Sequence, residues 1–183
     1  MILAEIAPPH FPVTLELAYA TPNNFTGKPI YRRSLCYLHP DALERLAHAI
    51  ELAAALGLRF KIFDAYRPTE AQWTMWRHTP DPEFLANPQR GSPHSRGVAV
   101  DLTLLDADGS ELDMGTPFDA FTTLSHHGSV LVSRPAQQNR YLLLGLMCAA
   151  GWDFYKKEWW HYQLFDARHY PLISDRALPQ PMM

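Results

Sequence analysis

Helical and strand-like segments follow one another in this chain without the regular strand–helix–strand alternation of a parallel α/β sheet. The two clearest helical patterns end at Gly57 and Gly151, and Pro40 suits the first turn of the earlier one. Predicted helices cover residues 40–56, 69–78 and 136–150. Predicted strands cover residues 13–19, 59–64, 98–104 and 158–165. This order predicts an α+β fold, a small mixed or antiparallel central sheet with flanking helices. The length of 183 residues suits one domain, residues 1–183.

Charge and hydropathy argue against two broad classes of partner. The formal net charge is −3, and no segment forms a basic face, so we expect no nucleic-acid partner. No run approaches the roughly 20 apolar residues of a membrane span, so we expect no membrane partner. The first residues, MILAEIAPPHFPV, lack a basic region followed by a long apolar stretch. We therefore expect no signal peptide and a cytoplasmic location.

His94 and Asp101 form the first half of a candidate metal site. They lie seven residues apart, where a Pro/Gly loop passes into the apolar run Val-Ala-Val-Asp-Leu-Thr-Leu. A carboxylate in such a run is costly unless it is paired, hydrogen-bonded or bound to a metal. At about 3.3 Å per residue, an extended path would hold the two side chains more than roughly 20 Å apart. Shared ligation therefore requires a turn at residues 95–97, and Gly97 is the residue that permits one.

Glu158 and His161 form the second half, within the aromatic segment Glu-Trp-Trp-His. Zinc held by two histidines and one carboxylate keeps a fourth position for water, and a nearby glutamate that is not a ligand can take the proton of that water. Each half alone is weak, because such histidines are more often surface or core residues and such tryptophans more often core packing. The two halves in this order are much more specific.

Both halves, with several flanking segments, closely resemble the zinc D-alanyl-D-alanine dipeptidases, which are known from glycopeptide resistance and peptidoglycan turnover. The resemblance extends over most of the chain. The other segments that carry it are Tyr19–Pro29, Asp64–Pro68, Met114–Asp119 and Ser125–His127. The fold implied is that shared by zinc DD-carboxypeptidases and the amino-terminal domain of hedgehog proteins.

The resemblance implies a role for each matching residue. His94, Asp101 and His161 match the ligands of one zinc ion, Glu158 matches the general base, and Arg67 matches an arginine that stabilises the tetrahedral intermediate. An arginine stays protonated at ordinary pH, which suits it to a developing oxyanion. Without the family, Arg67 reads more naturally as a structural residue in a turn.

Three further residues match positions near the free ammonium group of the substrate: Tyr19, Ser92 and Asp119, together with the second oxygen of Asp101. A site that binds both the ammonium and the carboxylate of one dipeptide selects dipeptides over longer peptides, because an extra residue would clash or bury an unpaired charge. The carboxylate partner and the D-stereochemistry do not follow from the residues themselves. His126 and His127 resemble extra ligands, but such sites need three protein groups. We interpret them as residues that either contact the ligands or are structural, and assign them no role.

Two alternative functions stay open from the sequence. A zinc DD-carboxypeptidase or L,D-type endopeptidase acting on longer wall peptides would use the same metal set, although no export signal is recognised. A non-catalytic zinc-binding module would not need Glu158 and Arg67, and both are present. The main hypothesis is a zinc dipeptidase with a small dipeptide as its partner, and the oligomeric state stays open.

Overall fold

The computed structural model describes residues 2–183 as an α+β fold, as predicted. Its three helices are α1 (Pro40–Ala54), α2 (Thr69–His78) and α3 (Arg134–Ala149). Its strands are β1 (Ala4–Glu5), β2 (Thr14–Leu15), β3 (Tyr37–Leu38), β4 (Arg59–Asp64), β5 (Ala99–Leu105), β6 (Asp153–Phe154) and β7 (His161–Gln163). Within these residues, no helix has the length and apolar character needed to cross a membrane.

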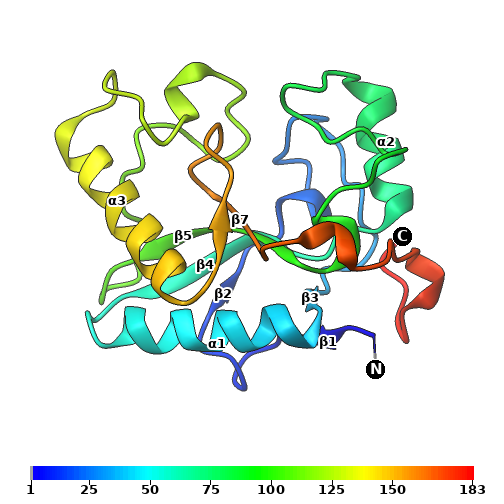
Figure 1. Ribbon diagram of the computed structural model, residues 1–183, viewed down its shortest axis with the longest axis horizontal. Helices are drawn as coiled ribbons and strands as arrows, with labels where there is room; N and C mark the ends of the chain where they lie inside the picture. The colour runs from blue at the N-terminus through cyan, green and yellow to red at the C-terminus, as the bar shows by residue number, and fades with distance from the viewer. Residues whose placement is uncertain (1) are drawn as a thin grey trace.

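The central sheet is mixed. Its strand order is β2-β4-β5-β7-β6, with β2 parallel to β4 and the other neighbours antiparallel. β1 and β3 form a separate antiparallel pair. Figure 1 shows α1 along the bottom of the view, with α3 and α2 on opposite sides above it and the central strands between them. This arrangement leaves the upper ends of the central strands between two groups of loops.

Local sequence explains why α1 begins at the predicted residue and ends within two residues of the predicted end. Pro40 occupies its first turn, and the His39 ring accepts a hydrogen bond from the Asp41 backbone N–H, which would otherwise lack a partner. Gly57 then takes a left-handed φ of +72°, a conformation that ends helices. The buried face of α1 consists of Ala42, Leu46, Ala49 and Ala53. The helical spacing of these residues turns one apolar stripe toward the core.

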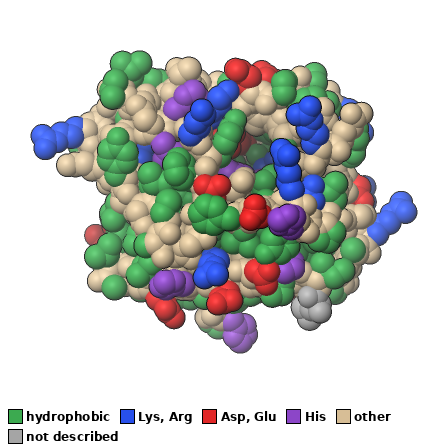
Figure 2. All heavy atoms as spheres, in the orientation of Figure 1, with side chains coloured by type: hydrophobic (Ala, Val, Ile, Leu, Met, Phe, Trp, Pro, Cys, Tyr) green, Lys and Arg blue, Asp and Glu red, His purple; other side chains and the backbone are tan. Residues whose placement is uncertain are grey.

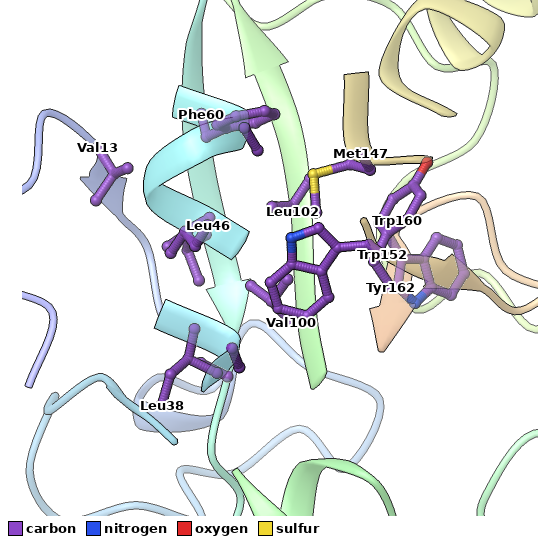
Figure 3. Close-up of a cluster of buried hydrophobic side chains, with 14 of the residues drawn as sticks. Val13, Leu38, Leu46, Phe60, Val100, Leu102, Met147, Trp152, Trp160 and Tyr162 are labelled. Atoms are coloured by element: carbon purple, nitrogen blue, oxygen red, sulfur yellow. The ribbon is translucent and has the colours of Figure 1, made fainter. Parts of the chain in front are cut away.

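The main hydrophobic core joins this stripe to the sheet and to α3. Leu46 from α1, Phe60 from β4, Leu102 from β5 and Met147 from α3 belong to one cluster (Figure 3). Trp152 is buried in the same cluster. Burying apolar side chains of this size stabilises a fold by about 1.5–3 kcal/mol each, so the cluster holds the central strands in a fixed register.

Two strands are much shorter than predicted. The strand predicted over residues 13–19 is only Thr14–Leu15, and Ala18–Ala20 form a turn of 3₁₀ helix instead. The strand predicted over 158–165 is only His161–Gln163. Glu158 lies in a turn, because its N–H donates to the carbonyl of Tyr155 and its carbonyl accepts from the N–H of His161. The aromatic composition of this segment reflects core burial rather than strand pairing. The other predicted helices and strands differ from the structure by at most two residues at an end.

His127 is buried beside β6 and β7. Its ring meets the rings of Phe154 and Tyr162 edge-on, at centroid distances of 5.1 and 6.2 Å. Neither ring nitrogen has a hydrogen-bond partner within residues 2–183. Burial, and to a lesser degree the nearby Arg140, lowers the pKa of His127 to about 4. The interpretation of His127 as a structural or ligand-supporting residue stays a prediction.

His127 is therefore expected to make stability depend on pH. Its pKa is lower in the folded chain than in the unfolded chain, so the unfolded state takes up the extra proton as pH falls below about 6.5. Stability is lost from there down to pH 4. Between pH 7 and 5, wild type should lose about 2 kcal/mol more unfolding free energy than His127→Gln. Urea unfolding of both metal-free proteins at the two pH values measures this difference. Equal losses would show that His127 does not titrate in this way.

Candidate metal centre

His94, Asp101 and His161 are brought together by a turn and by strand pairing. His94–Arg96 form a turn of 3₁₀ helix, and Gly97 closes it with a left-handed φ of +69°. The turn that shared ligation requires is thus confirmed. In the sheet, Asp101 on β5 is the direct partner of His161 on β7. Side chains of directly paired residues point to the same face of a sheet, so both reach the same space as His94.

Three potential ligand atoms converge in this space. The Asp101 Oδ1 atom lies 3.3 Å from His94 Nε2 and 3.1 Å from His161 Nδ1. The two nitrogens lie 3.1 Å apart, and all three side chains are buried. Burial alone would raise the pKa of Asp101, but the two imidazoles hold it well below its ordinary value. Two imidazole nitrogens and one carboxylate oxygen form a donor set that fits zinc with one coordination position left open.

Glu158 lies beside these atoms without joining them. Its Oε2 atom is 4.0 Å from His161 Nδ1, and only 14% of its side chain is exposed. Burial raises the pKa of Glu158 to about 7; Asp101 contributes to this rise, while His161 and Arg67 oppose it. Trp159, buried next to it, donates its backbone N–H to the carbonyl of Ser125. This bond ties the Glu158 turn to a neighbouring loop.

Arg67 is held rigidly at the edge of the same space. Its Nε donates to Asp64 Oδ2 at 2.8 Å, and its Nη1 donates to Gln72 Oε1 at 3.1 Å. Its Nη2 is 3.6 Å from Asp101 Oδ2, and its guanidinium lies 4.9 Å from the centre of the Tyr19 ring. A side chain with two of its nitrogens already bonded presents the third in a fixed direction.

The three residues expected near the ammonium group also reach this space. The Tyr19 hydroxyl donates to the two carboxylate oxygens of Asp119, at 3.1 and 3.0 Å. Asp119 itself has a left-handed φ of +59°, which is uncommon outside glycine. The Ser92 hydroxyl also stabilises the turn that carries His94, because it accepts a hydrogen bond from the His94 N–H at 3.2 Å.

A cavity of about 260 Å³ unites these residues. All eight site residues expected from the sequence line it: Tyr19, Arg67, Ser92, His94, Asp101, Asp119, Glu158 and His161. Loop residues 82–86 complete part of its wall. Figure 2 shows the surface hollowed between the side that carries α3 and the side that carries α2. A cavity of this size suits a small molecule rather than a folded partner.

Three residues that the sequence patterns do not single out also contact site residues: Asp64, Gln72 and Gln163. Asp64 ends β4 and precedes Arg67 by three residues. This spacing of an acidic and a basic residue is the sequence signal that could have indicated their buried ion pair. Gln163 follows His161 by two residues on β7, which places both side chains on one face. Gln72 lies on α2 and gave no sequence signal beyond being polar.

Known proteins resemble this chain over most of its length. A family model described as D-ala-D-ala dipeptidase matches residues 3–180. A D-alanyl-D-alanine dipeptidase of Escherichia coli (strain K12) is 45% identical over 162 residues, covering 88% of this chain and 84% of that protein. One of Enterococcus faecium is 37% identical over 175 residues, covering 84% and 87%. Among solved structures, a Serratia marcescens L-Ala D-Glu endopeptidase aligns at 16% identity and a TM-score of 0.46, covering 72% of this chain and 84% of that one. The family match and the two dipeptidase relatives together show that the chain belongs to the D-alanyl-D-alanine dipeptidase family of zinc peptidases.

Proposed function

We propose that this chain hydrolyses the dipeptide D-alanyl-D-alanine to two D-alanines, using one zinc ion in a domain that comprises residues 1–183. The observation that carries the proposal is the convergence of His94 Nε2, Asp101 Oδ1 and His161 Nδ1 in a cavity that Glu158 and Arg67 also line. The cytoplasmic location expected from the sequence stays a prediction, and the oligomeric state stays open.

The three converging atoms would hold the zinc ion. When bound, zinc supplies a Lewis acid that polarises the scissile carbonyl and lowers the pKa of water. The buried Asp101 carboxylate supports this assignment, because a charge in a strand of apolar neighbours needs a counter-charge.

Glu158 acts as the general base. Its carboxylate takes a proton from the attacking water and returns that proton to the nitrogen of the leaving D-alanine. Its position supports this role, since Oε2 is 4.0 Å from the His161 ring, close to the ligand atoms without being one of them. A carboxyl with a pKa near 7 can both accept and donate a proton at neutral pH.

Arg67 stabilises the negative charge that develops on the carbonyl oxygen. Asp64 and Gln72 occupy its Nε and Nη1, so its Nη2 has N–H groups left for the substrate. A cation fixed before the reaction begins does not have to reorganise as charge develops.

Asp119, oriented by the Tyr19 hydroxyl, binds the ammonium group of the substrate, with Ser92 and the second oxygen of Asp101 close by. A carboxylate in this position favours a substrate with a free amino end. An acyl group on that nitrogen would remove the positive charge and leave the Asp119 carboxylate without a cationic partner.

A panel of substrates tests the proposal. D-Ala-D-Ala should be cleaved, while N-acetyl-D-Ala-D-Ala should show a kcat/KM lower by about 100-fold or more, because the carboxylate–ammonium pair is lost. L-Ala-L-Ala tests the stereochemistry, and zinc content is measured on the same samples. Equal cleavage of the acetylated substrate would contradict the dipeptidase assignment in favour of a carboxypeptidase on longer wall peptides. A zinc-loaded protein that cleaves none of them would favour a binding module.

A further inference from the structure

Gln163 is a cavity-lining residue with no role assigned so far. It is the last residue of β7, two positions after His161, so both side chains leave the same face of the strand. Its backbone is paired on both sides, with Ala99 of β5 and with Asp153 of β6. Its Oε1 atom lies 3.1 Å from His161 Nε2, the ring nitrogen that faces away from Asp101.

The two imidazoles of the centre need opposite tautomers. His161 offers Nδ1 to the centre, so in the neutral ring its single proton must sit on Nε2. His94 offers Nε2, so its proton must sit on Nδ1. That Nδ1–H donates to the backbone carbonyl of Ala65 at 2.7 Å. The acceptor for His161 is instead a side chain, the amide oxygen of Gln163.

We propose that Gln163 is a positioning residue of the metal centre. Its amide oxygen accepts the Nε2–H of His161, which fixes the ring's rotation and tautomer and so presents Nδ1 as a ligand. This inference rests on the ligand set given under the proposed function. Partners of this kind also raise the basicity of a ligating histidine.

A neutral amide is a suitable acceptor at this position. The cavity is already lined by the carboxyl groups of Asp101, Asp119 and Glu158. A further carboxyl group at this position would add another negative charge near them, whereas an amide orients the ring without adding charge. Since strand pairing holds the backbone of Gln163 on both sides, changing its side chain should leave the sheet intact.

The test compares the variants Gln163→Leu, Gln163→Glu and His161→Ala with wild type. Zinc affinity is measured by competition with a chelator at constant pH, and the visible spectrum is recorded for the cobalt-substituted proteins. Thermal unfolding of the metal-free proteins checks the fold. Gln163→Leu should weaken zinc binding by about 10- to 100-fold and change the cobalt spectrum. Gln163→Glu keeps an acceptor oxygen, so its affinity should stay at or above that of wild type.

The outcomes separate this inference from the function on which it rests. If His161→Ala bound zinc as tightly as wild type, the ligand set itself would be wrong. If His161→Ala lost zinc while Gln163→Leu kept wild-type affinity and an unchanged cobalt spectrum, only the role of Gln163 would be wrong. If leucine and glutamate weakened binding equally, Gln163 would matter for packing and not as an acceptor, and the inference would also fail.

Discussion

Replacing Glu158 by glutamine is expected to lower kcat on D-Ala-D-Ala by about 100- to 10,000-fold while zinc binding stays at the wild-type level. Glutamine has nearly the same shape, but its amide cannot take a proton from water. Zinc should be retained because Glu158 Oε2 stands 4.0 Å from His161 Nδ1 and Glu158 is not part of the converging set. Steady-state kinetics and metal analysis of the same preparation measure both quantities.

A matched control is the same substitution at Glu51, an exposed residue of α1 on which no part of the proposed site depends. Glu51→Gln should keep wild-type kcat and zinc content. If Glu158→Gln were fully active, another group would have to be the base. If it lost zinc together with activity, Glu158 would be a ligand and the assignment of the two roles would have to change.

Local signals predicted much of this fold. The limits of α1 follow from Pro40 and Gly57, and β4 and α2 have the predicted bounds. The turn before β5 was predicted from Gly97, because two ligands seven residues apart cannot meet along an extended chain. In each case, the physical cause lies within a few residues of the feature it explains.

Features that depend on distant residues were not predictable in this way. The pairing of β2 beside β4, and the bond between Tyr19 and Asp119, join segments far apart in the chain. The segment 158–165 was assigned to a strand from its aromatic content, although Trp159 is buried in the core as part of a turn. Strand propensity reflects how well a side chain suits a buried environment. It therefore does not distinguish a strand from a turn that packs against the same core.

Replacing Arg67 is the second change with a large expected effect. It should lower both the activity and the stability of the protein, so the two effects must be measured separately. Arg67→Met should lower kcat/KM by about 100- to 1,000-fold, because a donor to the developing oxyanion is lost. It should also destabilise the fold by about 3–5 kcal/mol, because it leaves the buried carboxylate of Asp64 without its cation. Activity alone therefore cannot show which effect is responsible.

A second substitution, at Asp64, shows whether the loss of activity comes from catalysis or from stability. In Asp64→Asn/Arg67→Met the unpaired charge is gone, and the Tyr31 hydroxyl, which donates to Asp64 Oδ1 at 2.8 Å, can still donate to the asparagine oxygen. The double variant should regain most of the lost stability in urea unfolding and none of the lost kcat/KM. Asp64→Asn alone should keep zinc and lose less activity than Arg67→Met, since the guanidinium remains bonded to Gln72. Recovery of activity together with stability would mean that Arg67 acts only through the fold, and its role toward the oxyanion would be wrong.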